Sequence, residues 1–400
     1  MKEGVIIIGA GPAGLSLAKA LSVQGVPSTV VERQSEEAIS KPTLDGRDIA
    51  LTHLSRRIMQ KLDMWSLMPP AQVGRILEAR VLNGESDYFL HFHQKESGSD
   101  ELGYIVSNHL IRQAAYDSIK DEELVSVQFD TEVEDVFTSR DRADVVLKNG
   151  QTLSASLVAA ADSRFSVTRR KAGIAADMHD FGKAVIVCRM QVEQDHQGVA
   201  YECFHYGRTL AVLPLPGNLV SVVITAKTDN AQQLVELQTG EFNAQVSQSF
   251  KHRLGGMSLV TERFSYPLVA VLAKQFVSQR FALVGDAAVG MHPVTAHGFN
   301  LGLQSADSLA TGVKRALSIG QDIGSDFLLK RYQFRHRRAS LPMYHGTNGL
   351  VNLFNSDSFK ARLARDAVLR IGNNLPPLKR LIMNRLTEAR ESGLSLPFLK

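Results

Sequence analysis

The sequence predicts an α/β fold, in which a domain of alternating strands and helices carries an inserted, mainly antiparallel β-sheet and ends in a helical C-terminal region. Three observations predict this fold. A glycine-rich turn joins an apolar run to a helical segment at the start of the chain. Short β-branched runs, broken by proline and glycine, fill residues 184–225. The residues from 331 onward are helical in pattern and rich in Lys and Arg.

Length and composition indicate a globular protein. The 400 residues suit one large domain or two joined domains, and 44% of them are apolar and 22% charged. No apolar run approaches the roughly 18 residues that a membrane-spanning helix needs. The first residues carry no signal-peptide pattern, so we expect a cytoplasmic protein. Cys188 and Cys203 lie in strand-like apolar stretches and are expected to be buried free thiols.

The glycine-rich turn reads Gly9-Ala-Gly11-Pro-Ala-Gly14, between a strand predicted over 5–8 and a helix predicted over 13–24. Gly9 permits a tight turn, Gly11 lets a pyrophosphate approach the backbone, and Gly14 lets the helix pack closely on the strand. The N-terminus of the helix offers free N–H groups and a favourable dipole to phosphates. The motif therefore predicts a Rossmann-type unit that binds a dinucleotide.

A second strand, predicted over 27–32, ends in Glu32-Arg33, and Glu32 follows Gly9 by 23 residues. The Glu32 carboxylate is placed to accept hydrogen bonds from the ribose hydroxyls, and Arg33 is counted with it in the candidate cofactor site. A carboxylate at this position disfavours a 2′-phosphate, so NADP is not expected in this pocket. FAD and NAD share the fingerprint, and these residues alone leave both open.

Further elements follow the second strand. We expect helices over 47–62 and 108–119, an extended segment over 79–92, a meander over 125–157 and a buried strand that ends at Asp162. Beyond the middle sheet we expect a strand over 280–284, a helix from Gly298 toward Leu317, and a basic helical remainder interrupted by Pro342 and Pro376-Pro377.

The strand over 280–284 is followed by Gly285-Asp286, then by His292-Pro293 and by Gly298-Phe-Asn-Leu-Gly. With this block the sequence resembles the flavoprotein aromatic monooxygenases of the para-hydroxybenzoate hydroxylase type, and among them most closely the ubiquinone-biosynthesis hydroxylases. The resemblance covers nearly the whole chain. It implies that the dinucleotide is FAD.

The resemblance also implies roles for single residues. Asp286, after Gly285, would contact the ribityl chain and the pyrophosphate, while Pro293, Gly298 and Asn300 would lie against the isoalloxazine ring. Pro293 is therefore a candidate catalytic residue. A helix that begins near Gly298 would aim its positive end at the flavin edge where negative charge collects on reduction.

Arg47 and Asn108 match positions that contact FAD in this family, and Asp162 ends a strand in the family's Ala-Asp-Gly motif. The chain departs from the family twice. Ser163 replaces the glycine of that motif, which is costly if the position needs a positive φ. His297 stands where many ubiquinone hydroxylases have glutamine, so it is either a candidate catalytic residue that touches flavin or substrate, or a polar substitute in the loop.

The order of the elements predicts a discontinuous FAD-binding domain that encloses a substrate-binding sheet. Phe204, Leu213 and Pro214 are candidates for the wall of the substrate cavity. The expected limits are 1–78, 104–177 and 276–330 for the FAD-binding domain, 79–103 and 178–275 for the substrate domain, and 331–400 for the basic helical C-terminal region.

The family chemistry that the resemblance implies is hydroxylation of an electron-rich ring. NADPH or NADH reduces FAD, O₂ forms a C4a-hydroperoxide on the flavin, and its distal oxygen attacks the ring. The sequence has no second dinucleotide fingerprint and no redox disulfide motif, so the nicotinamide would bind transiently. The expected substrate is a prenylated phenol of ubiquinone biosynthesis. A soluble aromatic compound of catabolism or secondary metabolism, or FAD without turnover, remain the alternatives.

The C-terminal region carries an excess of positive charge. From residue 331 onward there are thirteen Lys or Arg and four Asp or Glu residues, a net +9, against −5 for the rest of the chain. Interleaved Leu, Ile and Phe favour a membrane surface or a protein partner over nucleic acid, for which we find no motif. Peripheral contact with the inner membrane, a biosynthetic complex, an oligomer or simple packing stay open. No metal site is expected, because His91 and His93 have no third ligand nearby.

Overall fold

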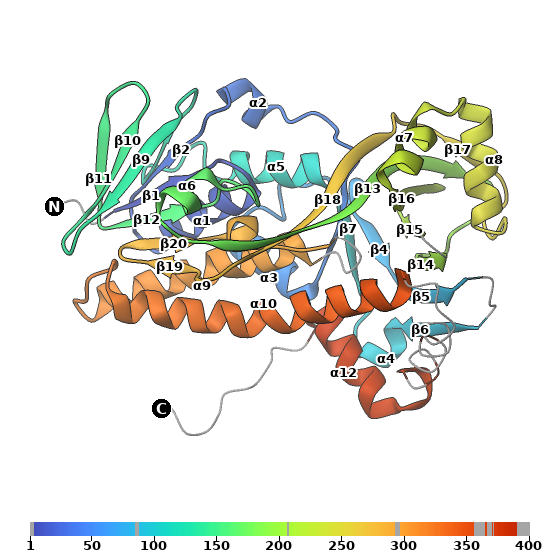
Figure 1. Ribbon diagram of the computed structural model, residues 1–400. Coiled ribbons are helices and arrows are strands. Elements are labelled where there is room, and N and C mark those ends of the chain that lie inside the picture. Colours follow the sequence, from blue (N-terminus) through green and yellow to red (C-terminus); the bar gives the residue numbers. More distant parts are fainter. Residues whose placement is uncertain are drawn as a thin grey trace.

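The computed structural model describes residues 4–84, 88–205, 208–292, 297–355, 365, 370 and 372–389. The molecule is elongated, with a parallel sheet and its helices toward one end and a larger, mainly antiparallel sheet toward the other (Figure 1). A long C-terminal helix runs beneath both (Figure 1). The predicted α/β class, with an inserted sheet and a helical C-terminal region, is confirmed.

The parallel sheet has the strand order β19-β20-β12-β1-β2-β8. Val5 and Ile7 of β1 pack against the helices on one face, and Ile6 and Ile8 pack against a small meander on the other. Both faces are covered, which is why β1 reads as an uninterrupted apolar run. The strands are β1 (Val5–Ile8), β2 (Ser28–Val31), β8 (Val125–Gln128), β12 (Leu157–Ala160), β19 (Val277–Ser278) and β20 (Phe281–Leu283). The covering helices are α1 (Pro12–Val23), α3 (His53–Lys61), α5 (Asn108–Asp117) and α9 (Gly298–Ser318), and the meander is β9 (Val133–Thr138), β10 (Ala143–Leu147) and β11 (Thr152–Ala155).

The prediction of one helix over 47–62 is wrong for its first part. Residues 48–51 form β3 (Asp48–Leu51), which pairs with β7 (Gly103–Ser107) in a three-stranded sheet completed by β4 (Gly74–Ile76). The helix α3 begins only after Thr52, whose hydroxyl accepts the backbone N–H of Ser55 at 3.2 Å. Pairing with a strand more than fifty residues away outweighs the local helical spacing. Smaller elements are α2 (Glu36–Ser40), η1 (Pro70–Gln72), α4 (Gln94–Ser97) and α6 (Val167–Lys171).

The larger sheet has the order β21-β18-β13-β16-β15-β14-β5-β6, with β17 paired to β13. All its pairs are antiparallel except β14 with β5. Its strands are β5 (Glu78–Asn83), β6 (Phe89–His93), β13 (Ala176–Val192), β14 (Val199–His205), β15 (Arg208–Pro214), β16 (Leu219–Lys227), β17 (Met257–Leu259), β18 (Phe264–Ala273) and β21 (Val289–Gly290).

The two faces of this sheet are covered differently. Ile186, Cys188 and Val222 belong to an apolar cluster that also includes residues of α7 (Thr228–Glu236) and α8 (Thr239–Ser249), two helices not expected from the sequence. Side chains in the alternate register, such as Val185 and Val223, point to the opposite face and line a cavity. Strand alternation thus separates a packed face from a face open to a ligand.

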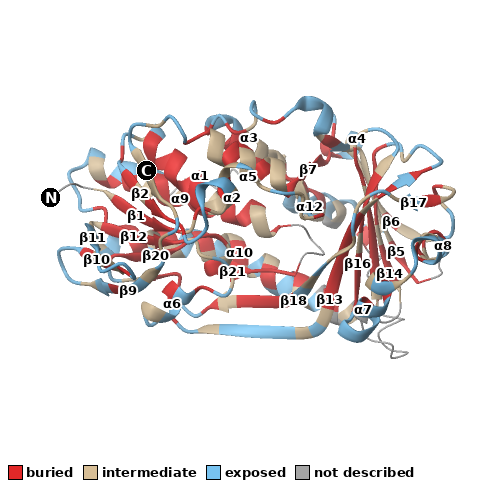
Figure 2. Cartoon of the chain, turned by 90° about the horizontal axis from the view of Figure 1, so that it is seen from above, coloured by how far each residue is buried: buried red, intermediate tan, exposed pale blue. Residues whose placement is uncertain are grey.

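Strands β13 and β18 connect the two ends of the molecule. They pair from Ala176 to Val187, with a register break between Asp180 and Ala184. Between the two ends, residues 177–180 of β13 are exposed, whereas 184–188 are buried in the inserted sheet (Figure 2). The pair is therefore a two-stranded ribbon that crosses from one layer to the other.

The C-terminal helices described are α10 (Asp326–Asn355) and α12 (Pro376–Thr387). Pro342 lies inside α10, so the predicted interruption there is wrong. Tyr332 anchors α10 by donating its hydroxyl to the Leu283 carbonyl at 2.6 Å, and such tertiary contacts offset the lost backbone hydrogen bond. Pro376 and Pro377 stand in the first turn of α12, where proline is well tolerated. Within the described residues we find no helix with the length and apolar character to span a membrane.

Candidate active site

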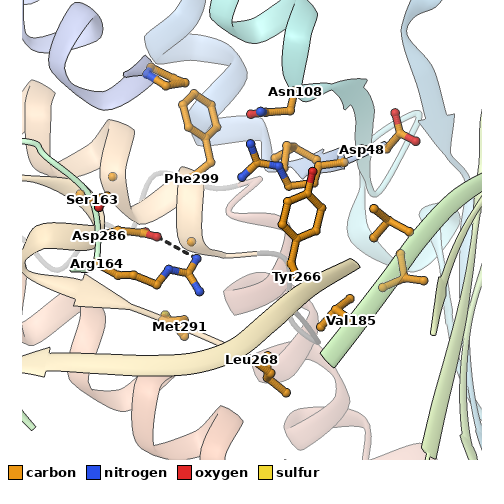
Figure 3. Close-up of a pocket in the computed structure, with 18 of the residues that line it drawn as sticks. Asp48, Asn108, Ser163, Arg164, Val185, Tyr266, Leu268, Asp286, Met291 and Phe299 are labelled. Atoms are coloured by element: carbon orange, nitrogen blue, oxygen red, sulfur yellow. Dashed lines mark hydrogen bonds and ion pairs between the residues drawn. The ribbon is translucent and has the colours of Figure 1, made fainter. Parts of the chain in front are cut away.

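A cavity of about 590 Å³ lies between the parallel sheet and the inserted sheet. Its walls come from the starts of α1, α5 and α9, from β3, from the loop after β12, from η2 (Gly285–Ala287), and from one face of β13–β16 with β18. In open parallel sheets, ligands bind beyond the carboxyl ends of the strands, which is where these loops and helix starts meet. Figure 3 shows Asp286 and Arg164 on one side of the cavity and Tyr266 and Val185 on strands opposite.

Two helix N-termini face this cavity. Gly11 and Ala13 at the start of α1 line it, as do Gly298 and Phe299 at the start of α9. Neither helix has an acidic residue in its first turn. The unpaired N–H groups and positive dipole ends therefore make two places that favour a negatively charged group.

The three glycines of the first turn have separate structural roles. Gly9 has φ +105°, and a Cβ there would stand 2.8 Å from the carbonyl oxygen of Ala161. A Cβ on Gly14 would stand 2.0 Å from the Gly9 carbonyl oxygen, so only glycine allows α1 to pack against the turn. A Cβ on Gly11 would meet nothing within 4 Å, and this glycine lines the cavity.

Glu32 is buried at the end of β2, where its Oε2 accepts the backbone N–H of Ala10 at 2.6 Å and its Oε1 accepts that of Gln34 at 2.9 Å. These bonds hold the carboxylate beside the glycine turn, outside the lining of the cavity itself. Arg33, the next residue, is exposed. Contact of either residue with a ribose stays a prediction.

The loop after β12 is held by the Asp162 carboxylate. It accepts the hydroxyl of Ser166 and the backbone N–H of Thr168, at the start of α6. Asp162 does not line the cavity, but Ser163 and Arg164 do. Ser163 has φ +82°, so the serine adopts the left-handed conformation that glycine would adopt freely.

Asp286 lines the cavity together with Gly285, which has φ +63°. The Asp286 carboxylate pairs with the Arg164 guanidinium, 3.0 Å between Oδ2 and Nη2, and Arg164 also donates to the Val269 carbonyl at 3.1 Å (Figure 3). A Cβ built on Gly298 would stand 3.9 Å from the Asp286 Oδ1. The Gly-Asp pair and the start of α9 are thus neighbours, as the predicted cofactor site requires.

Arg47 and Asn108 line the cavity within a polar cluster around Asp45. The Asp45 carboxylate accepts Arg47 Nε at 3.0 Å and Asn108 Nδ2 at 2.7 Å. Burial alone would raise the pKa of Asp45, but the hydrogen bond and charge of Arg47 outweigh it and lower that pKa. The Arg47 guanidinium lies 5.3 Å from the ring centre of Tyr266, whose hydroxyl donates to the Asp45 carbonyl at 2.7 Å. Tyr266 and Asp45 were not expected from the sequence.

Asn300 and His297 are not among the residues that line the cavity. The Asn300 amide donates to the Ala50 carbonyl at 2.8 Å and accepts the Thr52 N–H at 3.0 Å, which ties α9 to the end of β3. His297 is buried and immediately precedes α9. Pro293 lies outside the described residues. Direct contact of these residues with flavin or substrate stays a prediction.

The inserted sheet supplies an apolar wall that includes Val185, Val187, Leu213 and Val223. Leu213 therefore lies where the sequence placed it. Phe204 and Pro214 are not among the lining residues, and Phe204 packs in a cluster with Leu90, Phe92, Leu102 and Met383. Glu202 also lines this wall and was missed. Its signal in the sequence is a single carboxylate inside the apolar strand segment Val199–Phe204.

The residues of this cavity fit FAD. Gly11 leaves the backbone open to a pyrophosphate, the α1 N-terminus favours its charge, and the α9 N-terminus favours the flavin edge that becomes negative on reduction. Asp286, Arg47 and Asn108 add polar groups between these two helix ends. The apolar strand face then leaves room for an aromatic ring beside the flavin.

Comparison with known proteins agrees with this geometry. A family model described as FAD binding domain matches residues 2–341. The chain is 50% identical over 391 residues to Ubiquinone hydroxylase UbiM of Neisseria meningitidis, covering 97% of this chain and 85% of that protein. It is 35% identical over 395 residues to Ubiquinone hydroxylase UbiL of Rhodospirillum rubrum, covering 99% and 92%.

Among solved structures, p-nitrophenol 4-monooxygenase PnpA from Pseudomonas putida superposes with a TM-score of 0.77 at 18% identity, covering 96% of this chain and 98% of that one. At this identity the likeness concerns the fold. It places the parallel sheet and the inserted sheet in one known architecture.

Proposed function

The chain belongs to the FAD-binding-domain family and, within it, to the ubiquinone hydroxylases, and from this premise we propose that it hydroxylates the ring of a lipid-tailed phenol in ubiquinone biosynthesis. The protein is a FAD-dependent monooxygenase. NADPH or NADH would serve as the transient reductant and O₂ as the oxidant. One observation carries the proposal: two helix N-termini, each without an acidic residue in its first turn, share a cavity with the apolar face of a sheet.

Bound FAD supplies electron transfer from the nicotinamide and the activation of O₂. The chain's own residues bind FAD and the substrate, orient them toward each other and exclude water from the site. Gly9, Gly11 and Gly14 with Glu32 and Arg33 would hold the adenosine and pyrophosphate. Arg47, Asn108, Gly285, Asp286 and Gly298 would hold the ribityl chain and ring, and Asp162 and Asn300 would position their loops.

The proposed substrate ring would lie on the strand face of β13–β16. In the assignment that we propose, segments 1–78, 104–177 and 276–330 bind FAD, and segments 79–103 and 178–275 bind the substrate. Val185, Val187 and Val223 offer apolar contact area without hydrogen-bonding groups, which suits an aromatic ring and excludes water from it.

A lipid tail would bring the substrate to the enzyme at the membrane surface. On α12, Leu381 is 57% exposed and stands beside Arg380, and Leu386 is exposed beside Arg385. Exposed apolar residues among basic ones suit contact with an anionic bilayer. We therefore propose a cytoplasmic enzyme that meets the inner membrane peripherally. Sedimentation with phosphatidylglycerol vesicles tests this, and loss of binding in Leu381→Glu but not in Val260→Glu, another exposed apolar site, is expected.

Quinone profiling tests the function. In a strain that lacks this gene and any paralogue, mass spectrometry should show less ubiquinone and accumulation of a prenylated phenol that lacks one ring hydroxyl. Re-expression of the chain should restore ubiquinone, and re-expression of Asp286→Ala should not. Unchanged ubiquinone with no accumulated intermediate would contradict the proposal. Hydroxylation of small soluble phenols at full rate without detergent or lipid would then favour the alternative of a soluble aromatic substrate.

A further inference from the structure

Glu202 is a carboxyl at the β14 edge of the wall that the inserted sheet contributes to the cavity. It lies on β14, pairs with Ala211 on β15 and Val81 on β5, and lines the cavity. The cross-strand row continues through Val223 and Val187. Every other side chain of this row is apolar, so Glu202 is its one group able to form a hydrogen bond.

Among the described residues, no hydrogen bond or ion pair reaches the Glu202 side chain. Burial raises the pKa of Glu202 to about 8, and no neighbouring charge contributes to that shift. The adjacent Tyr201 and Cys203 point to the opposite face, into the cluster under α7 and α8. Of the other titratable groups that line the cavity, Arg47, Asp48, Arg164 and Asp286 are on other walls. Tyr266 lies on β18 of the same sheet, with β13, β16 and β15 between it and β14, and its hydroxyl donates to the Asp45 carbonyl.

The strands that pair with β14 place no basic side chain beside Glu202. On β5, Arg80 pairs with Glu78, and Arg80 lies over the Tyr201 ring, on the other side of the sheet. On β15, Arg208 donates to Ser249 of α8, again on that side. Glu202 therefore faces the cavity without a basic residue to hold its charge.

A partly buried carboxyl that has apolar neighbours and no hydrogen-bond partner is poorly solvated in a folded protein, and an apolar side chain would suit this wall better. Such groups mark sites where a ligand supplies the missing partner. The ligand group must donate a hydrogen bond and be attached to an otherwise apolar molecule. A phenol hydroxyl has both properties.

Building on the proposed function, we propose that Glu202 is a catalytic residue that binds the ring hydroxyl of the phenolic substrate and accepts its proton before hydroxylation. The phenol O–H bond breaks, the proton passes to a Glu202 carboxylate oxygen, and the electron pair stays on the phenolate oxygen. The negative charge raises the electron density of the ring, which is the property that an electrophilic oxygen donor needs. No further oxidant or reductant enters this step.

The environment of Glu202 makes this proton transfer feasible. A phenol has a pKa of about 10, and an ordinary glutamate of about 4.3, so transfer between them is unfavourable by roughly a millionfold. With the raised pKa of about 8, the disadvantage falls to roughly a hundredfold. The fraction of Glu202 in the carboxylate form increases as pH rises toward 8, so the rate of hydroxylation should increase with it.

The kinetic test uses the full-length protein loaded with FAD, a 2-prenylphenol in detergent micelles and NADPH or NADH. For the wild type, kcat/KM should rise with an inflection near pH 8. In Glu202→Gln it should fall by about 10²-fold or more and lose that inflection, with FAD content unchanged. Val223→Ala, in the same row, should raise KM and keep the inflection. A Glu202→Gln enzyme with the wild-type pH profile, or with kcat/KM within about threefold, overturns the proposal.

A second measurement separates this proposal from the function on which it rests. Because the folded pKa of Glu202 lies above its ordinary value, its stabilising effect is present below about pH 4.5 and is lost as pH rises through about 8. The Tm of Glu202→Gln minus the Tm of the wild type should therefore increase from pH 5 to pH 9. For Glu241→Gln, at an exposed site, the same difference should stay constant. A constant difference overturns the proposal. A pH-dependent difference without hydroxylation of any phenol would contradict the proposed function alone.

Discussion

Ser163 has φ +82° in the loop that lines the cavity. A left-handed conformation costs a non-glycine residue about 1–2 kcal/mol, while glycine loses about 0.4–1 kcal/mol more backbone entropy on folding. Ser163→Gly should therefore raise the free energy of unfolding by up to about 1 kcal/mol, measured by urea denaturation. The same change at exposed Ser126 in β8, an ordinary extended strand, should lower it by about 0.5–1 kcal/mol. Equal effects at both sites would contradict the strain at Ser163.

Asp286 is the residue whose loss should most directly weaken FAD binding. Asp286→Ala removes a carboxylate of η2 that lies beside the start of α9, and leaves Arg164 without its ion-pair partner. We expect FAD affinity to fall by about 1.5–3 kcal/mol, a factor of roughly ten or more, in calorimetric titration of apoprotein. Asp307→Ala, on the outer part of α9 and paired with Lys61, is the matched control. A fully yellow Asp286→Ala protein would contradict the assigned contact.

For single residues, sequence motifs predicted which residues lie near the site better than they predicted what the side chains contact. The glycines, Asp286, Arg47 and Asn108 could be predicted because each belongs to a local pattern. Asp162 and Asn300 occur in such patterns too, but their side chains bond to α6 and β3, which only the folded chain reveals. Glu202 and Tyr266 reach the cavity through sheet pairing and alternation, so no short window of sequence could single them out.

The turn between β1 and α1 offers a test at the scale of an element. In Gly14→Ala the new methyl group would collide with the Gly9 carbonyl, so we expect a loss of about 1–3 kcal/mol of stability and of FAD binding together. Gly11→Ala meets nothing within 4 Å but points at the cavity. Its apoprotein should keep the wild-type Tm while FAD affinity drops about tenfold. A matching loss of Tm in both variants would contradict this division of roles.

Helix α10 carries a buried histidine that should make the protein sensitive to acid. His336 lies 5.1 Å from the ring centre of Phe276, and burial lowers its pKa to about 4. Because the folded pKa lies below the ordinary value of 6.5, its stabilising effect is present above pH 6.5 and is lost as pH falls toward 4. The loss approaches about 3 kcal/mol at the lower limit.

The measurement is the pH dependence of the free energy of unfolding. His336→Gln should flatten the slope between pH 6.5 and 4, whereas exposed His252→Gln should leave it unchanged. Part of the slope should remain in His336→Gln, because burial also lowers the pKa of His292 to about 4. An unaltered slope in His336→Gln would show that the pKa of His336 is not lowered in the folded protein.

Elements with strong local patterns were predictable, and those set by distant partners were not. The strand over 5–8 and the helix from Gly298 carry continuous apolar or periodic patterns and were confirmed. Residues 48–51 have helical spacing but pair with β7, and Pro342 is tolerated inside α10 because that helix packs on α9. The helices α7 and α8 lie within residues 178–275, which were expected to form a substrate-binding sheet, so neither helix was predicted.

On the scale of the whole molecule, the two sheets are joined by more than the β13–β18 ribbon. The Asp48 side chain of β3 is fully buried and pairs with Arg189 of β13, 2.6 Å between Oδ1 and Nη2. Ala270 and Ala273 of β18 belong to the same apolar cluster as Ile6 and Ile8 of β1. The core of one sheet therefore contains residues of the other.

This shared core predicts a single unfolding transition. Calorimetry and far-UV circular dichroism should report the same Tm, and FAD release should coincide with it. Added FAD should move the whole transition upward, by about 2.7 kcal/mol of stability at a hundred times Kd. Two separate transitions, of which only one responds to FAD, would contradict the coupling.

The inserted sheet keeps its stabilising contacts and its ligand contacts on opposite faces. Along β13, β14, β15 and β16, side chains that pack under α7 and α8 alternate with side chains that line the cavity. A substitution on the cavity face therefore leaves the packed face intact. Descendants of one ancestor can change the molecules that they accept, one outward-facing strand position at a time, and still inherit a folded protein at every step.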